Sequence, residues 1–156
     1  MKDTTDFLKQ IPNNVPDDTL LVSFDVESLY SNIDHKIGLE AVSYWIDKFK
    51  HEIPQRYSKD FIIKSLAFIL ENNTFQFNNE CYRQTKGTAM GMKVAPTYAT
   101  LTIGYLENML YDSIRAKFGT EFSNQFQNLW KRFLGDCFIP WSRSQEDLHE
   151  LQSYPQ

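Results

Sequence analysis

The sequence predicts an α+β fold with a small antiparallel sheet and helices packed on one face of it. A short apolar run at 19–25 ends on an acid, which is typical of a strand with a polar end. In segment 129–141, two apolar arms flank the pair Gly135-Asp136, as the arms of a β-hairpin flank its turn. Apolar residues also recur at helical spacing in three longer stretches, 34–49, 58–72 and 96–118.

The first third of the chain is expected to contain a loop, a strand and a helix. Residues 1–18 are polar and rich in turn formers, and they are expected to form an approach loop that includes a short amphipathic piece near Phe7. The strand follows at 19–25, and residues 28–33 form a turn. Asp34 is then the expected N-cap of the first long helix, because its side chain can accept hydrogen bonds from free backbone N–H groups.

The middle of the chain is expected to contain a second helix, capped by Ser58, and then a small hairpin. The pair Asn78-Asn79 separates two short strands and suits a two-residue turn. A glycine-bracketed loop at 87–91 leads to the third helix, for which Gly119 is the expected stop.

Length and composition suit a single globular domain. Residues 144–147 resemble a capping box and are expected to begin a last helix, which is cut off at Gln156. The chain has 156 residues, 42% of them hydrophobic, and no apolar run approaches the roughly 18 residues of a membrane span. No signal peptide opens the chain, so an intracellular protein is expected. The two cysteines, Cys81 and Cys137, follow no disulfide or metal spacing and are expected to be reduced.

The net charge is −4, which is unusual for a protein that binds phosphate backbones. Basic residues nevertheless gather in two segments, while acids are more frequent in residues 1–60 and in the tail. The basic residues are Arg83, Lys86, Lys93, Lys131, Arg132 and Arg143. They indicate either a surface that faces nucleic acid or ordinary solvated charge.

Three segments follow the order and character of the central palm motifs of reverse transcriptases: LLVSFDVESLY at 20–30, GTAMGMKVAPTYA at 87–99 and WKRFLGDCFIPW at 130–141. The chain resembles this family over about residues 5–152. The sequences of its three motifs are most similar to those of Penelope-like retroelements. The resemblance implies a polymerase palm with part of the fingers, so that 1–156 is expected to be a partial reverse transcriptase domain that lacks most of the fingers and all of the thumb. It also implies a nuclear protein if the retroelement is eukaryotic.

The resemblance implies catalysis by two Mg²⁺ ions, which Mn²⁺ could replace. Asp25, at the end of the first strand, and Asp136, in the central hairpin, become the catalytic carboxylates and metal ligands, with the backbone carbonyl of Val26 as a further ligand. The strand pattern by itself predicts that both acids reach one edge of the sheet. Taken alone, an acid after a strand is more often a turn or cap residue.

The third motif departs from the family at one position. The family has two consecutive aspartates, whereas here Gly135 precedes Asp136. A type II′ turn favours glycine at its first central position, so Gly135 is expected to keep the hairpin while it removes a carboxylate. Loss of that ligand is expected to impair activity by at least the ~10- to 100-fold that loss of an outer-shell partner costs.

Five further residues receive roles from the resemblance. Tyr30 becomes the side chain that blocks the 2′-hydroxyl of a ribonucleotide, and Gly91 lets the backbone approach a nucleotide. Gln84, Lys86 and Lys93 are candidate contacts to phosphate or template. The alternatives are a core tyrosine for Tyr30 and ordinary surface positions for the three polar residues.

The activity that the resemblance implies is RNA-directed DNA polymerisation, with an RNA template, a DNA primer and a dNTP as partners and no membrane. The first alternative is a non-catalytic palm remnant that only binds nucleic acid or protein. The second is an unrelated sheet-type RNA-binding module, which requires Phe24, Phe133 and Phe138 to point outward for base stacking. The second alternative leaves the GTAMGMKVAP segment unexplained.

Overall fold

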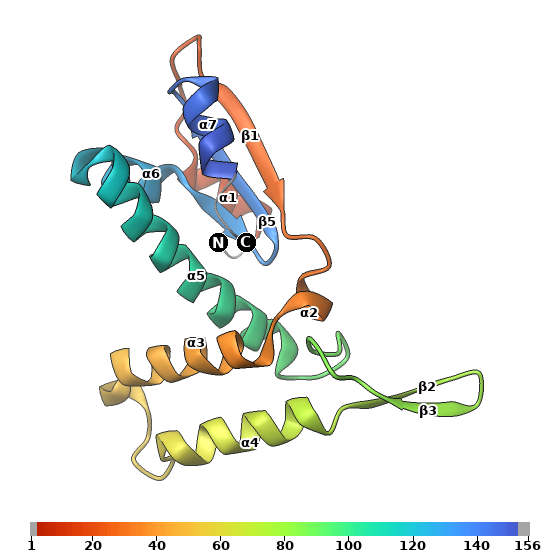
Figure 1. The fold of residues 1–156 in the computed structure, drawn as a ribbon. Coiled ribbons are helices and arrows are strands. Elements are labelled where there is room, and N and C mark those ends of the chain that lie inside the picture. The colour runs from red at the N-terminus through yellow and green to blue at the C-terminus, as the bar shows by residue number, and fades with distance from the viewer. Residues whose placement is uncertain (1–2, 153–156) are drawn as a thin grey trace. The chain divides into compact units, whose positions relative to one another are not determined.

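The computed structural model describes residues 3–152 and divides the chain into two compact units. The first unit combines the two ends of the chain, up to residue 26 and from residue 114 onward, and the second consists of residues 27–113. The long helix α5, Ala95–Phe118, belongs to the second unit over most of its length and to the first in its last turn (Figure 1). None of the described helices is long and apolar enough to cross a membrane.

Within the described residues, the first unit contains a three-stranded antiparallel sheet in the order β1-β5-β4. The strands are β1 Leu20–Asp25, β4 Lys131–Phe133 and β5 Asp136–Trp141. The central strand β5 pairs with β1 from Leu20↔Trp141 to Asp25↔Asp136. The predicted α+β class, with a small antiparallel sheet and helices packed alongside, is therefore confirmed.

One face of this sheet is buried by aromatic packing. Ile139 and Trp141 lie on this face and are each 1% exposed. Helix α6, Thr120–Leu129, packs here, because the ring of Phe122 meets Trp141 edge-on with centroids 5.8 Å apart. The sequence reasoning assigned no element to α6. Gly119, with a φ of 88°, directly follows the last residue of α5 and is the N-cap residue of α6. The same glycine therefore ends one helix and precedes the next.

Helices α1 and α7 lie near the ends of the described chain, at Thr4–Gln10 and Gln145–Gln152. α1 forms within the predicted approach loop, because Asp3 Oδ1 accepts a 2.8 Å hydrogen bond from the backbone N–H of Asp6. α7 begins at the predicted capping box, where Ser144 Oγ accepts a 3.1 Å hydrogen bond from the N–H of Asp147. The last part of that predicted helix, 153–156, lies outside the described residues.

The second unit contains the elements α2 Leu29–Asn32, α3 His35–Lys48, η1 Lys50–Glu52, α4 Lys59–Glu71, β2 Thr74–Phe77 and β3 Glu80–Arg83. Both predicted caps form: the side chain of Asp34 caps α3 and that of Ser58 caps α4. Asn78 and Asn79 join β2 to β3 with φ values of 50° and 63°, as a type I′ turn requires.

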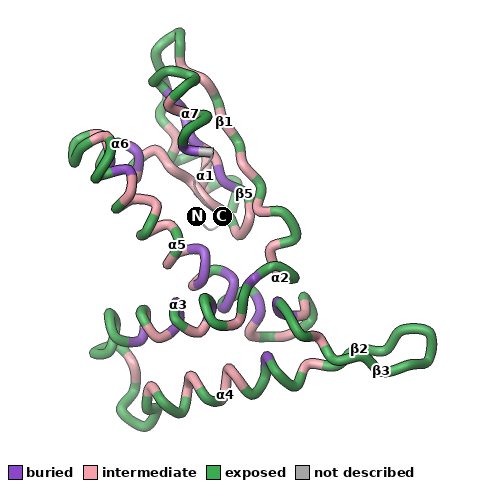
Figure 2. Tube along the Cα trace, viewed as in Figure 1, coloured by how far each residue is buried: buried purple, intermediate pink, exposed green. Residues whose placement is uncertain are grey.

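The core of the second unit lies among α3, α4 and α5. Its buried cluster consists of Ile33, Val42, Ile46, Leu70, Tyr98 and Ala99. A Cβ on Gly38 would overlap the hydroxyl end of the Tyr98 ring, so the glycine allows α3 to pack against this tyrosine. In contrast, the β2–β3 hairpin is exposed at every position (Figure 2).

Candidate functional site

Asp25 and Asp136 lie directly opposite each other at one end of the β1–β5 ladder. One residue further along, the backbone N–H of Val26 donates a 3.1 Å hydrogen bond to the carbonyl of Gly135. In an antiparallel ladder, a bond at this place makes the Asp25–Asp136 pair a non-hydrogen-bonded one, in which the Cα atoms are ~4.5 Å apart and the side chains are closest. The structure thus brings the two predicted carboxylates together, although they are far apart in the chain.

The two carboxylates form an uncompensated pair of negative charges. Both side chains are exposed, and neither carboxylate has a hydrogen-bond or ion-pair partner within residues 3–152. Like charges directly opposite each other on a sheet are destabilising. Over the same residues, no three His, Cys, Asp or Glu side chains gather as a metal site. A cation at this place would therefore be held by two carboxylates together with backbone or water oxygens.

Gly135 lies beside the acid pair, in the turn of the central hairpin. Phe133 pairs with Asp136, which leaves only Leu134 and Gly135 between the strands. Leu134 has a φ of 52°, whereas Gly135 is outside the left-handed region. The expectation that Gly135 occupies the first central position of the turn is therefore wrong. Leu134 occupies it, because the strand pairing begins one residue earlier than the Gly-Asp pattern indicates.

Position 135 has the space that a metal-binding side chain would need. A Cβ on Gly135 would lie 3.4 Å from Asp25 Oδ1 and 3.6 Å from the carbonyl oxygen of Val26, which are ordinary contacts. An aspartate here would therefore begin beside Asp25 without backbone strain. The donors around the position, two carboxylates and a carbonyl, are the hard oxygen ligands that Mg²⁺ prefers. The oxygens present are of the kind that a divalent cation binds, and residue 135 adds no side-chain oxygen to them.

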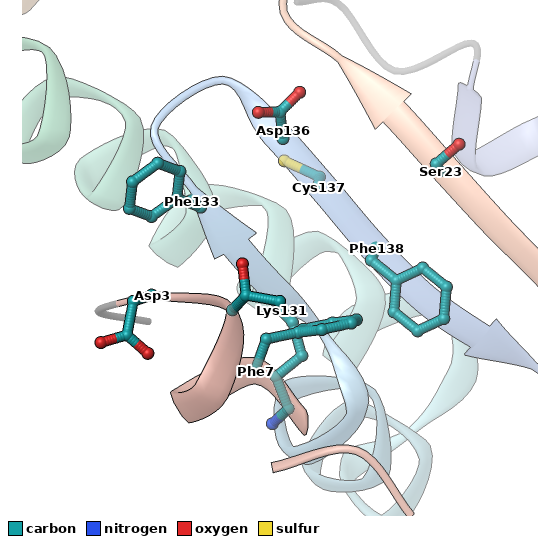
Figure 3. Close-up of a pocket in the computed structure, with 9 residues that line it drawn as sticks. Asp3, Phe7, Ser23, Lys131, Phe133, Asp136, Cys137 and Phe138 are labelled. Carbon is teal, nitrogen blue, oxygen red and sulfur yellow. The ribbon is translucent and has the colours of Figure 1, made fainter. Parts of the chain in front are cut away.

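A cavity of about 480 Å³ lies beside Asp136, between β1, β4, β5 and α1 (Figure 3). The rings of Phe7, Phe133 and Phe138 line it together with the stem of Lys131. The rings of Phe7 and Phe138 meet edge-on with centroids 5.3 Å apart, so α1 forms one wall of the cavity. Its volume is within the range of small-molecule sites, about 300–1,000 Å³.

The three phenylalanines of the base-stacking alternative do not share one face. Phe24 pairs with Cys137, whereas Phe138 pairs with Ser23. Because successive residues of a strand alternate between faces, Phe24 and Phe138 point to opposite sides of the sheet. The ring of Phe24 packs against Trp130, with centroids 5.9 Å apart. The expectation that Phe24 points outward on the same face as Phe138 to stack bases is therefore wrong.

In the second unit, the loop before α5 is hydrogen-bonded to the segment that carries Tyr30. The N–H of Thr88 donates to the carbonyl of Tyr30 at 2.6 Å, and the N–H of Gly87 donates to that of Ile33 at 3.1 Å. His35 Nε2 lies 2.6 Å from the carbonyl oxygen of Gly87, a hydrogen bond in which the ring nitrogen donates. Sequence reasoning missed His35, because a histidine at the start of a helix carries no signal of such a distant contact.

Two of the candidate nucleic-acid contacts hold this loop in place. Gln84 uses both atoms of its amide: Nε2 donates to the carbonyl of Lys86 at 2.8 Å, and Oε1 accepts from Asn73 Nδ2 at 2.7 Å. Lys86 Nζ donates to Asn32 Oδ1 at 3.2 Å and remains exposed. Gln84 is thus a structural bridge, and Lys86 is the more accessible of the two for an anionic partner.

The remaining candidates differ in their surroundings. Tyr30 is half-buried and packs against the core cluster of the second unit. Gly91 and Lys93 are exposed, and within the described chain a Cβ on Gly91 would have only its adjacent residues within 4 Å. Close backbone packing therefore gives no reason for a glycine at 91.

The acid pair is the part of the described chain that is best equipped for chemistry. Its carboxylates and the neighbouring carbonyl can ligate a divalent cation, and the cavity beside Asp136 has room for a second molecule. Comparisons of the chain with protein-family models, curated proteins and solved structures found no match.

Proposed function

We propose that this chain is a reverse-transcriptase-type palm whose acid pair binds Mg²⁺, and that Gly135 makes it inactive or strongly impaired in RNA-directed DNA polymerisation. The observation that carries the proposal is the direct pairing of Asp25 with Asp136 across β1 and β5. Two-metal nucleotidyl transfer requires carboxylates that are placed in advance on separate rigid elements. The resemblance of three segments to palm motifs is the reason for proposing this particular reaction, RNA-directed DNA polymerisation.

The roles in the reaction follow from the charges of these residues. Asp25, Asp136 and the carbonyl of Val26 would hold Mg²⁺, which when bound would supply activation of the primer 3′-hydroxyl and neutralisation of the dNTP triphosphate. Asp25 and Asp136 supply negative charge at a fixed separation, and the carbonyl of Val26 supplies a neutral oxygen. Gly135 supplies no ligand. Water can fill the missing coordination position, but it brings no charge to balance a second cation.

A non-catalytic palm remnant is the second candidate, and Gly135 itself favours it. Such a chain would keep the hairpin and the acid pair while it binds only nucleic acid or protein. Because the net charge is −4, we expect the chain alone to bind primer and template weakly, since it can neutralise few phosphates. A fluorescence titration with an RNA–DNA hybrid at moderate salt checks this expectation, and tight binding would contradict it.

The deciding experiment compares Gly135→Asp with Gly135→Asn, which has nearly the same shape but no charge. We expect Gly135→Asp to bind Mn²⁺ at least about tenfold more tightly than the wild type, and Gly135→Asn to resemble the wild type, since even outer-shell changes alter metal affinity ~10- to 100-fold. Primer extension is then measured with each variant joined to the fingers and thumb of an active reverse transcriptase. Equal Mn²⁺ affinity of the two variants would exclude the metal site, whereas tight binding without extension would favour the remnant.

A further inference from the structure

The β2–β3 hairpin of the second unit has an open, uncharged edge along β2. The two strands pair only with each other, so neither has a second neighbouring strand among residues 3–152. Figure 1 shows the hairpin extending beyond the helices of the second unit. β2 contains no charged residue and no proline, and its pairing with β3 has no bulge. It therefore lacks the features that normally protect an exposed edge from pairing with another strand.

The hydrogen bonds of the hairpin show which backbone groups point out of this edge. Just beyond the ladder, the N–H of Gln84 donates to the carbonyl of Asn73 at 2.9 Å, so Asn73 directs its backbone groups towards the β3 side. In an antiparallel pair this direction alternates along the strand. Thr74 and Gln76 therefore direct their N–H and C=O groups away from β3. The open edge offers the donors and acceptors of these two residues.

The hairpin also carries three exposed aromatic side chains on one face. Phe75 lies opposite Tyr82 in the ladder, and their rings stack with centroids 5.6 Å apart. Phe77 is two residues from Phe75 and therefore lies on the same face. A two-stranded hairpin on its own is marginally stable, whereas three or more strands with an apolar face are stable. A further strand along β2 would therefore stabilise this hairpin.

We propose that β2 pairs antiparallel with β2 of a second copy of this chain, which gives a four-stranded sheet in the order β3-β2-β2-β3. A two-fold axis places the same face of both hairpins on one side of the sheet, so the aromatic rings of both copies gather there. With Gln76 opposite Gln76 of the second copy, Phe75 of each copy lies opposite Phe77 of the other. This register pairs all four phenylalanines, whereas a register centred on Phe75 pairs only two.

The backbone geometry of the hairpin agrees with this register. Because Gln76 directs its N–H and C=O groups outward, the two copies of Gln76 can exchange hydrogen bonds across the axis. The flanking pairs of Phe75 with Phe77 are then non-hydrogen-bonded pairs, in which side chains are closest. Aromatic residues that face each other across strands stabilise a sheet. Phe75 would lie between Tyr82 of its own hairpin and Phe77 of the second copy.

The distribution of charge favours a second copy as the partner and limits the assembly to two copies. The charged residues of the two strands are Glu80 and Arg83, and both belong to β3. No charges meet where the two β2 edges join. The outer edges of the four-stranded sheet are the β3 strands, whose charges oppose further pairing. A nucleic acid is a poorer partner for β2, because this strand offers no cation to a phosphate.

The size of the surface predicts a weak dimer. Phe75, Phe77 and Tyr82 are 52%, 61% and 41% exposed. If each side chain has roughly 200 Å² of surface, they expose about 300 Å² per copy, or about 600 Å² in two copies. The backbone edges add to this area, but the total stays near the low end of specific interfaces, ~1,200 Å². We therefore expect a dissociation constant in the micromolar to millimolar range.

The first test is sedimentation equilibrium of the full chain under reducing conditions, so that the exposed thiol of Cys81 cannot cross-link copies. The concentration is varied from about 10 µM to about 1 mM, which brackets the expected affinity. We expect the average mass to rise from the 18.3 kDa of one chain towards the mass of two. A mass that stays at one chain, or that exceeds two chains, would overturn the inference.

Gln76→Lys and Gln76→Glu test the register. In either variant alone, like charges lie opposite each other across the axis, so the dissociation constant should rise about fivefold. In an equal mixture the opposite charges meet, and association should return at least to that of the wild type. Such recovery requires both variants to be folded. A mixture that associates no better than the separate variants would overturn the inference.

Cys81→Lys is the matched control for these charge variants. Cys81 is the ladder partner of Gln76, so it lies on the same face of the hairpin, but it belongs to β3. The new lysine adds the same charge away from the joined edge. We expect its dissociation constant to stay close to that of the wild type. Equal weakening by Gln76→Lys and Cys81→Lys would assign the effect to the charge of the hairpin as a whole and would overturn the inference.

Discussion

Asp25 and Asp136 face each other across β1 and β5 as a non-hydrogen-bonded pair, so the fold holds two negative charges side by side. We expect Asp136→Asn to raise the free energy of unfolding by roughly 0.2–1 kcal/mol without divalent cations, because it removes the repulsion. Mg²⁺ should stabilise the wild type by mass action and the Asn variant much less. Urea unfolding at low ionic strength, with EDTA or with Mg²⁺, measures both effects. A wild type that gains no stability from Mg²⁺ would contradict the metal site.

Tyr30 is predicted to select deoxynucleotides. Because it also packs against the buried cluster of the second unit, a test must separate this role from that of a core residue. In a Gly135→Asp chain joined to fingers and thumb, Tyr30→Ala should admit ribonucleotides while deoxynucleotide incorporation continues, since removing a clash relaxes specificity. Tyr30→Phe keeps the ring and serves as the control. The measurement is the ratio of the two incorporation rates. An unchanged ratio in Tyr30→Ala would make Tyr30 only a core residue, as its contact with the buried cluster allows.

Gly38 is predicted to be essential for packing in the second unit. Gly38→Ala should lower the free energy of unfolding by about 1–3 kcal/mol, the typical cost of overpacking, because the new Cβ overlaps the ring of Tyr98 and that ring is 2% exposed. Gly135→Ala is the control within the same chain, since its Cβ makes only ordinary contacts. Denaturant unfolding of both variants measures the difference. Equal stability of the two would show that Tyr98 can move away.

Tyr98 is predicted to make stability depend on alkaline pH. Burial, and secondly the charge of Asp34, raises the pKa of Tyr98 from 10.0 to about 12. Between these values the unfolded chain loses the phenolic proton while the folded chain keeps it, so the free energy of unfolding should fall as pH rises from 10 towards 12. Urea unfolding at several pH values measures the slope.

Tyr98→Phe is the variant that checks the source of this slope. It should remove the contribution of this residue above pH 10. At neutral pH it should be at least as stable as the wild type, because the Tyr98 hydroxyl is buried without a hydrogen-bond partner within the described residues. An unchanged slope in Tyr98→Phe would assign the alkaline sensitivity to other groups.

Local chemistry made several elements predictable. Asp34 and Ser58 cap helices because their side chains accept hydrogen bonds from backbone N–H groups two or three residues ahead, a contact that depends only on neighbours in the sequence. Asn78-Asn79 turns the exposed hairpin because asparagine tolerates positive φ. α6 was missed because most of its first half is polar, so its apolar face is recognisable only when it packs on the sheet.

The sequence by itself determined which segments become strands and that Asp25 ends the first of them, but it placed Asp136 in the turn, whereas the structure makes Asp136 the first residue of β5. Only the tertiary structure decided that these two acids are direct partners, that Leu134 rather than Gly135 takes the first turn position, and that Phe24 faces away from Phe138. The reason is register: a shift of one residue moves every side chain of a strand to the opposite face. The register of β1 on β5 depends on pairing between distant segments and on the burial of Trp141 and Ile139. No local pattern in either strand contains that information.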